Sequence, residues 1–186
     1  MARGSEETGG RGGGVVAPAC HLAATLLQLT GAHRTRSSVA VSPLRIQQVD
    51  GDAMVRDWQH VHNMIIPSHL LSLDEVQERS GRHRLTVAYL GDVLVGCSTV
   101  RPPADGTSTA TVISRVLPAH RRQGIGRQLY ERELAEARAL GADVIETVVL
   151  ASNEDGLQFA LSRGFSEIER YLLPGDSVPY IDLRLT

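Results

Sequence analysis

The stretch from residue 121 to residue 127, "RRQGIGR", combines residue types that bind anions. Glycine has no Cβ, so the oxygens of a ligand can approach the backbone amides closely, and the arginines add positive charge. An amphipathic run follows, and the first turn of a helix leaves amide groups free at the positive end of the helix dipole. The pattern predicts a phosphate or pyrophosphate site built from Arg121, Arg122, Gln123, Gly124, Ile125, Gly126 and Arg127.

Two other phosphate-binding motifs do not fit this stretch. A dinucleotide fingerprint would need a third glycine at position 129, which is Leu129. A nucleotide P-loop would need Gly-Lys followed by Ser or Thr, and the stretch lacks that sequence. The predicted anion therefore belongs to a compound that neither motif binds.

The run behind the loop has the spacing of a helix that starts near Gly124 and stops at Gly141. The charged residues of this run, Glu133 among them, are predicted to lie outward. Its apolar residues recur on one side: Ile125, Leu129, Tyr130, Leu134 and Ala137.

The other elements follow from periodicity and from cap and turn signals. Ser72 and Glu75 have the spacing of a capping box, and Gly91 and Asp92 form a turn between two strands within 83–103. Further helices are predicted at 51–66, 73–80 and 154–163, and further strands at 44–50, 108–118, 143–150, 165–173 and 180–186. The predicted order is β α α β β β α β α β β.

Two sequence motifs, placed within this order of elements, resemble motifs of the GNAT superfamily of acyl-CoA N-acyltransferases. The R-x-x-G-x-G of Arg121, Gly124 and Gly126, after a strand that ends in "VLP", resembles the pyrophosphate motif of that superfamily. The segment 153–165, "NEDGLQFALSRGF", resembles its N-x-x-A-x-x-F-Y-x-x-x-G-F block. The resemblance covers residues 44–186. It implies an α/β (α+β) fold with a mixed, mostly antiparallel central sheet flanked by helices.

The resemblance implies a function and a set of ligand contacts. Acetyl-CoA is the expected co-substrate, and its pantetheine arm enters between the strands at 111–117 and 143–150, which splay apart. Val116 and Leu117 would offer it backbone groups, and backbone donors in a dry cleft stabilise the oxyanion formed when an amine attacks. Asn153 would contact the arm, or cap the next helix, or do both. The expected reaction is acetyl transfer to a primary amine of a small molecule or peptide, by direct attack in a ternary complex.

The sequence departs from the family at the general acid. Ala160 stands where many relatives carry a tyrosine that protonates the leaving thiolate. A thiolate is a tolerable leaving group because a thiol has a pKa of about 8.5, so it could leave unaided. The alternatives that carry a hydroxyl are Tyr130, Tyr171 and Ser162. A catalytically silent acyl-CoA-binding module therefore stays open as a second function.

The candidate base is also a single residue. Glu146 is the one carboxylate inside the strand at 143–150 after the coenzyme helix, and a charge within a central strand needs a reason. His60, His62 and His69 resemble a metal set, but the spacing of the first two points them to different sides of a helix. No metal site is predicted, and His60 or His62 can line the acceptor pocket.

The composition limits the remaining classes of function. The chain has 186 residues, a net charge of -2 and a pI near 6.4, which gives no reason to expect nucleic-acid or membrane binding. Cys20 and Cys97 lack disulfide-framework or zinc spacing, which favours a reducing, cytoplasmic location. Residues 1–43 are predicted to be a disordered or loosely helical extension, with a targeting segment as the alternative, and 44–186 to be one domain. A homodimer is left open.

Overall fold

The computed structural model describes residues 43–104 and 106–186. The predicted order of elements and the predicted fold class are confirmed, with one added 3-10 turn, η1. The predictions for residues 1–42 and for Cys20 lie outside the described residues. The strands are β1 (Leu44–Gln48), β2 (Arg84–Leu90), β3 (Val93–Arg101), β4 (Thr109–Val116), β5 (Val144–Leu150), β6 (Phe165–Tyr171) and β7 (Tyr180–Leu185). The helices are α1 (Gly51–Ile65), α2 (Leu73–Arg82), α3 (Ile125–Ala139) and α4 (Glu154–Ser162), and η1 is Pro118–His120.

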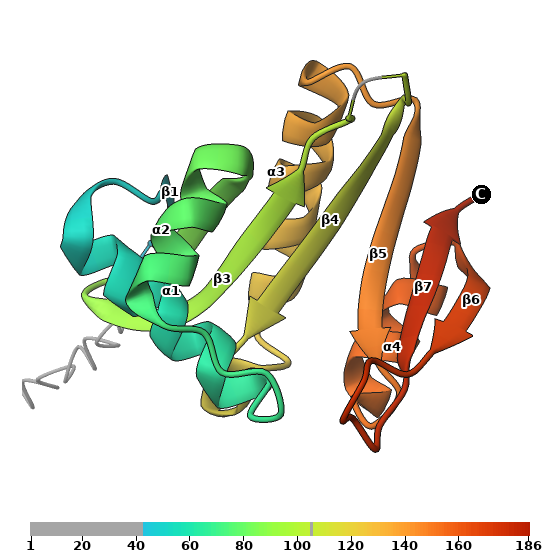
Figure 1. The fold of residues 1–186 in the computed structure, drawn as a ribbon. Coiled ribbons are helices and arrows are strands. Elements are labelled where there is room, and N and C mark those ends of the chain that lie inside the picture. The colour runs from blue at the N-terminus through green and yellow to red at the C-terminus, as the bar shows by residue number, and fades with distance from the viewer. Residues whose placement is uncertain (1–42, 105) are drawn as a thin grey trace, which may run out of the picture. The chain divides into compact units, whose positions relative to one another are not determined.

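The seven strands form one sheet in the order β1-β2-β3-β4-β5-β7-β6. Every neighbouring pair is antiparallel except β4 and β5, which are parallel. The two parallel strands are in register over only three pairs, from Thr109 with Val144 to Thr111 with Glu146. Figure 1 shows them side by side where they begin and apart where they end. The splay that the family resemblance implied is therefore present.

Two helices, α2 and α4, begin where a capping side chain accepts a hydrogen bond from a free amide. In α2 the Ser72 hydroxyl accepts a hydrogen bond from the Glu75 amide at 3.3 Å, and the Glu75 carboxylate accepts one from the Ser72 amide at 2.7 Å. This is the predicted capping box, which pairs two otherwise unpaired backbone donors. In α4 the Asn153 Oδ1 accepts from the Gly156 amide at 3.2 Å. The cap role proposed for Asn153 is therefore confirmed.

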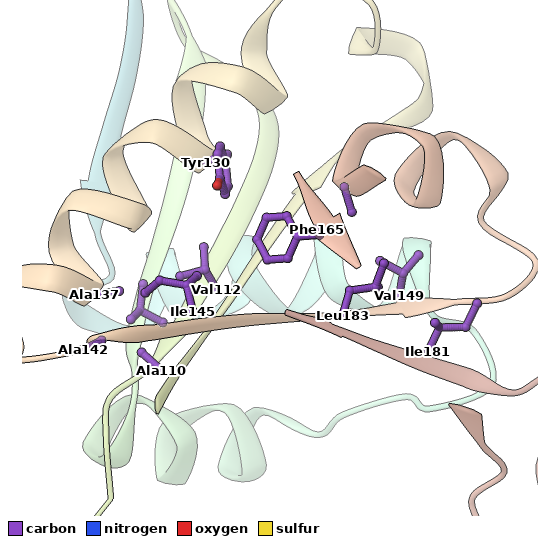
Figure 2. Packing of buried hydrophobic residues seen from close by; sticks show 12 residues of the cluster. Ala110, Val112, Tyr130, Ala137, Ala142, Ile145, Val149, Phe165, Ile181 and Leu183 are labelled. Atoms are coloured by element: carbon purple, nitrogen blue, oxygen red, sulfur yellow. The ribbon is translucent and has the colours of Figure 1, made fainter. Parts of the chain in front are cut away.

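Each face of the sheet carries a hydrophobic core. On one face, Tyr130 of α3 and Phe165 of β6 lie over side chains of the sheet such as Val112 of β4 (Figure 2). The rings of Tyr130 and Phe165 meet edge to face with centroids 5.9 Å apart, an arrangement that aromatic pairs favour. On the other face, Trp58 of α1 and other α1 and α2 residues pack against β2 and β3. These two cores fix the sheet between α1 and α2 on one side and α3 and α4 on the other.

The predicted outward position of Glu133 is wrong. Its side chain is 1% exposed, and its Oε1 accepts a hydrogen bond of 2.9 Å from the Thr86 hydroxyl of β2. Thr86 and Ser98 form a polar patch on the sheet under α3, and this patch turns the helix position inward. Burial raises the pKa of Glu133 above its usual range. Helical spacing alone did not reveal the polar partner, because that partner lies 47 residues away in sequence.

Candidate active site

A cavity of about 1190 Å³ opens where β4 and β5 separate. Its walls include the parts of the two strands that do not pair with each other, from Val112 to Val116 and from Thr147 to Leu150. Leu117 directly beyond β4 donates its amide to the Val95 carbonyl of β3 at 2.9 Å. Because successive residues of a strand direct their backbone groups to alternate sides, Val116 and Ser114 direct theirs toward the gap. The cavity therefore contains a strand edge that a ligand can pair with.

The glycine-rich loop lies at one end of this cavity. Gly124 has φ 80° and Arg122 has φ 62°, both in the left-handed region, and α3 begins at Ile125. A non-glycine residue in this region costs free energy and is concentrated at functional sites. Alternating left-handed and right-handed residues turn successive amides toward one concave side, which binds anions. Arg122 and Gly124 are the left-handed residues of this loop, and the phosphate site stays a prediction.

Arg121 fixes the loop to its surroundings. Its Nε donates to the Val116 carbonyl at 3.2 Å, and its Nη1 lies 3.5 Å from Asp155 Oδ2 at the start of α4. The carbonyl of Val116 is thereby already engaged, and its amide is the backbone group left for a ligand. Arg121 is thus a positioning residue between β4 and α4 as well as a source of charge.

The structure brings together seven of the ten residues predicted to bind the coenzyme. Leu117 lies outside the lining, because its carbonyl accepts from the His120 amide at 2.9 Å and its own amide goes to Val95. Ile125 is 3% exposed and packs in a core with Leu129, so only its backbone can serve a ligand. Gln123 is exposed beside the cavity and does not line it. The seven in the lining are Val116, Arg121, Arg122, Gly124, Gly126, Arg127 and Asn153.

Ala160 lines the same cavity from α4 and is 4% exposed. The position where relatives carry tyrosine therefore faces the site, and here it presents a methyl group. Ser162 donates its hydroxyl to the Phe159 carbonyl at 2.7 Å and is outside the lining. Tyr130 lines the cavity, and burial raises its pKa. Tyr171 lines it from β6 and donates to Asp182 Oδ1 at 3.3 Å.

Glu146 lies at the last position of β5 that pairs with β4, beyond the lining of the cavity. Arg184 of β7 donates two hydrogen bonds to its Oε1, from Nε at 3.1 Å and from Nη2 at 2.7 Å. This ion pair gives the carboxylate a structural partner and lowers its availability to a substrate. A catalytic role for Glu146 stays a prediction.

Of the three histidines, His62 and His69 line the cavity and His60 is exposed outside it. His62 Nε2 lies 3.0 Å from the His69 carbonyl, which only accepts, so this nitrogen carries the proton and Nδ1 is the acceptor. Burial, then the charge of Arg115, lowers the pKa of His62 to about 4, so the ring is neutral at neutral pH. Among residues 43–104 and 106–186, no cluster of three or more His, Cys, Asp or Glu is placed to hold a metal ion.

Sequence reasoning missed the cationic and aromatic residues at the other end of the cavity: Arg79, Arg101, Arg115 and Tyr180. Arg115 sits inside an apolar strand, which is the same signal that drew attention to Glu146. Arg79 and Arg101 come from α2 and the end of β3, 22 positions apart in sequence, and no spacing rule connects them. Only the fold brings them together.

The sequence of this domain matches one known protein family. The profile of the acetyltransferase (GNAT) family matches residues 52–165, which is more than half of the chain. The chain belongs to the GNAT acetyltransferase family. Membership supports acetyl transfer as the general class of reaction. The matched range includes both the glycine-rich loop and the whole of the second motif, so the resemblance to the superfamily is confirmed.

Solved structures show the same fold at low sequence identity. The yncA protein of Salmonella typhimurium, solved with its cofactor acetyl-CoA, has a TM-score of 0.63 and 20% identity over 76% of this chain and 92% of its own. The ribosomal-protein-S18-alanine N-acetyltransferase of Escherichia coli has 0.63 and 19%, over 77% and 93%. A Bacillus subtilis acetyltransferase in complex with CoA has 0.56 and 22%, over 77% and 98%. A comparison with curated proteins finds no match. Within the described part of the chain, no helix is long and apolar enough to cross a membrane.

Proposed function

We propose that this domain is an acetyl-CoA-dependent N-acetyltransferase that acts on a primary amine. The observation that carries the proposal is the cavity between the separated ends of β4 and β5, with the glycine-rich loop at one end. The pyrophosphate of the coenzyme would lie against the first turn of α3, and the pantetheine arm would lie along the edge of β4. Two solved structures of this fold contain acetyl-CoA or CoA, which supports the assignment.

The residues of the gap would activate the thioester. An amide of β4, such as that of Val116, would donate to the thioester carbonyl, and donation strengthens as negative charge develops on that oxygen. The amine nitrogen then forms a bond to the carbonyl carbon, and the carbon–sulfur bond breaks. The bond electrons leave on sulfur, and the ammonium proton passes to a base. The products are the acetylated amine and coenzyme A.

The two proton transfers use different groups. With Ala160 in the lining, we propose that the thiolate leaves without a tyrosine donor and takes its proton from water or from Tyr130. Glu146 stays our proposed proton acceptor, acting through water because its carboxylate is held by Arg184. The reaction needs no metal in this scheme.

Binding of acetyl-CoA to the intact protein tests the coenzyme assignment. Calorimetry and thermal unfolding are expected to show micromolar binding, with about 2.7 kcal/mol of stabilisation at a hundred times the dissociation constant. Arg122→Glu places a carboxylate beside the proposed phosphates and is expected to weaken binding. Arg82→Glu, an exposed residue of α2 outside this cavity, is the matched control. No heat and no thermal shift at saturating acetyl-CoA would contradict the proposal.

One observation favours a second candidate function. The methyl group of Ala160 faces the cavity where relatives place their acid, which fits a module that binds acyl-CoA without turnover. Release of thiol from acetyl-CoA in the presence of an amine panel separates the two functions. A protein that binds acetyl-CoA and releases no thiol with any amine would be such a module. Ala160→Tyr is then expected to raise the rate only where a slow reaction is limited by the missing acid.

A further inference from the structure

Three arginines line the cavity on the face of the sheet that α1 and α2 cover. Arg115 of β4 is the cross-strand neighbour of Cys97, which belongs to the core under α1, so both side chains share that face. Arg101 ends β3 four positions after Cys97 and, by the alternation of strand residues, lies on the same face. Arg79 extends from α2. The glycine-rich loop instead begins α3, which packs on the opposite face.

Arg115 is held in place with part of its guanidinium unsatisfied. It lies over the Trp58 ring with its Cζ 5.9 Å from the ring centroid, a cation–π contact. Its Nη1 is buried and has no hydrogen-bond partner among the described residues. Burial lowers the pKa of Arg115, and the like charges of Arg101 and Arg79 contribute to the lowering. A buried donor without a partner costs free energy, and an anion that accepts from it removes that cost.

The carboxylates near these arginines are already used. Glu75 accepts from the amide and hydroxyl of Ser72 in the capping box of α2. Asp182 accepts from the Tyr171 hydroxyl at 3.3 Å. Within residues 43–104 and 106–186, none of the three arginines forms an ion pair of 4.0 Å or less. Three guanidinium groups thus stand against two carboxylates, Glu75 and Asp182, and none of the three is held in such an ion pair.

The walls beside these arginines carry histidine and tyrosine side chains, and His69 Nε2 lies 3.6 Å from the buried carboxylate of Asp176. His62 is uncharged at neutral pH, and its Nδ1 is buried without a partner in the described part of the chain. The Tyr180 ring stacks with His69 at 6.2 Å and with Tyr171 at 5.9 Å. Such walls accept an uncharged amine beside His62 but disfavour a ligand with several positive charges, because three guanidinium groups repel it. An acceptor of opposite charge is favoured instead.

We propose that the acceptor is an amine that also carries a carboxylate, with the carboxylate bound by Arg79, Arg101 and Arg115. This inference rests on the proposed N-acetyltransferase function and specifies its substrate class. Guanidinium groups bind carboxylates by paired, charge-assisted hydrogen bonds, which fix orientation as well as add affinity. Binding the carboxylate at this end directs the amine toward the gap between β4 and β5, where the acetyl group would lie.

Paired acceptors that differ only in charge test the inference. Glycine, β-alanine, 4-aminobutyrate and L-methionine are each compared with the corresponding primary amide, and thiol release from acetyl-CoA is followed with the intact protein. We expect at least one carboxylate member to exceed its amide in kcat/KM by about tenfold or more, the size of one charged hydrogen bond. In parallel, each compound is titrated calorimetrically into protein saturated with coenzyme A.

Variants then connect the preference to the arginines. Arg101 is exposed, so Arg101→Gln is expected to fold and to reduce the carboxylate preference about tenfold, with acetyl-CoA affinity unchanged. Arg79→Gln and Arg115→Gln are made in the same way. If Arg115→Gln fails to fold, Arg79→Gln and Arg101→Gln still test the inference. Arg45→Gln is the control, because Arg45 is exposed on β1 and pairs with Asp92 outside the cavity. The control is expected to keep the wild-type preference.

Several results would overturn the inference while the proposed function stands. One is turnover of amides equal to or faster than that of every carboxylate partner. Another is a preference that Arg101→Gln and Arg79→Gln leave intact. A third is a loss of acetyl-CoA affinity in Arg101→Gln, which would assign the arginines to a coenzyme phosphate. A protein that binds acetyl-CoA but neither binds nor acetylates any carboxylate member would also refute it. Failure to bind acetyl-CoA at all would instead refute the proposed function.

Discussion

Replacing Gly124 by alanine separates the cost of backbone strain from the loss of a ligand contact. Gly124 has φ 80°, and a Cβ built on it meets no other atom within 4 Å. The variant therefore causes no clash, but it forces an alanine into the left-handed region, at a cost of about 1 to 2 kcal/mol. For a protein of this size the expected fall in Tm is roughly 2 to 8 °C.

Gly141 provides a matched control for this experiment. It has φ 91°, its Cβ would also meet nothing within 4 Å, and it ends α3 outside the lining of the cavity. Gly141→Ala is therefore expected to lose a similar amount of stability. The two variants carry the same chemical change and the same type of strain at opposite ends of one helix.

Only the Gly124 variant is expected to lose coenzyme affinity. The space beside Gly124 is open to the cavity, and a methyl group there blocks the close approach of phosphate oxygens to the amides. Loss of one hydrogen bond to a charged group weakens binding about ten- to a hundredfold. Calorimetry with acetyl-CoA, well below the Tm of both variants, measures the difference. Wild-type affinity in Gly124→Ala, or an equal loss in Gly141→Ala, would refute the reasoning.

Three further outcomes are expected. Removal of residues 1–40 should leave a protein that folds and binds acetyl-CoA, whereas an insoluble product would show that this segment supports the domain. Glu146→Gln should lower kcat/KM about a hundredfold if Glu146 accepts the proton, and Arg184→Gln should not; equal small effects would mean an ion pair alone. The pKa of His62 is about 4 in the folded protein and 6.5 in the unfolded chain. The neutral ring therefore contributes about 3 kcal/mol to the free energy of unfolding above pH 6.5, and this contribution is lost as the pH falls toward 4. Urea unfolding of His62→Gln should therefore show a flatter pH dependence, and a wild-type slope would exclude this residue as a cause.

The local signals of the sequence were sufficient to predict the order of the elements. The capping box at Ser72, the turn at Gly91 and the glycine at the start of α3 act over a few residues, so their consequences could be predicted without knowledge of the fold. The two motifs stand at the starts of α3 and α4, and the family pattern related them to one proposed coenzyme site. Seven of the residues they indicated line one cavity for this reason.

Partners that are distant in sequence were not predictable. Glu133 points inward because the Thr86 hydroxyl on the sheet beneath it donates a hydrogen bond to its carboxylate. Glu146 forms an ion pair with Arg184 of the last strand. The arginine end of the cavity combines α2, β3 and β4, whose side chains meet only because the sheet order places them around one opening. Periodicity reports which side of an element is apolar, but not which polar groups it will face.

The short contact between β4 and β5 leaves two strand edges that a bound coenzyme could cover. Beyond the three residue pairs that join β4 and β5, the facing edges of the two strands continue without pairing with each other. Exposed edges of this kind are prone to pair with other chains, and proteins usually cover them. A pantetheine arm that covers these edges would slow the hydrogen exchange of the β4 and β5 amides and stiffen the junction between two half-sheets. Cellular coenzyme concentration would then influence the resistance of the protein to aggregation as well as its rate of turnover.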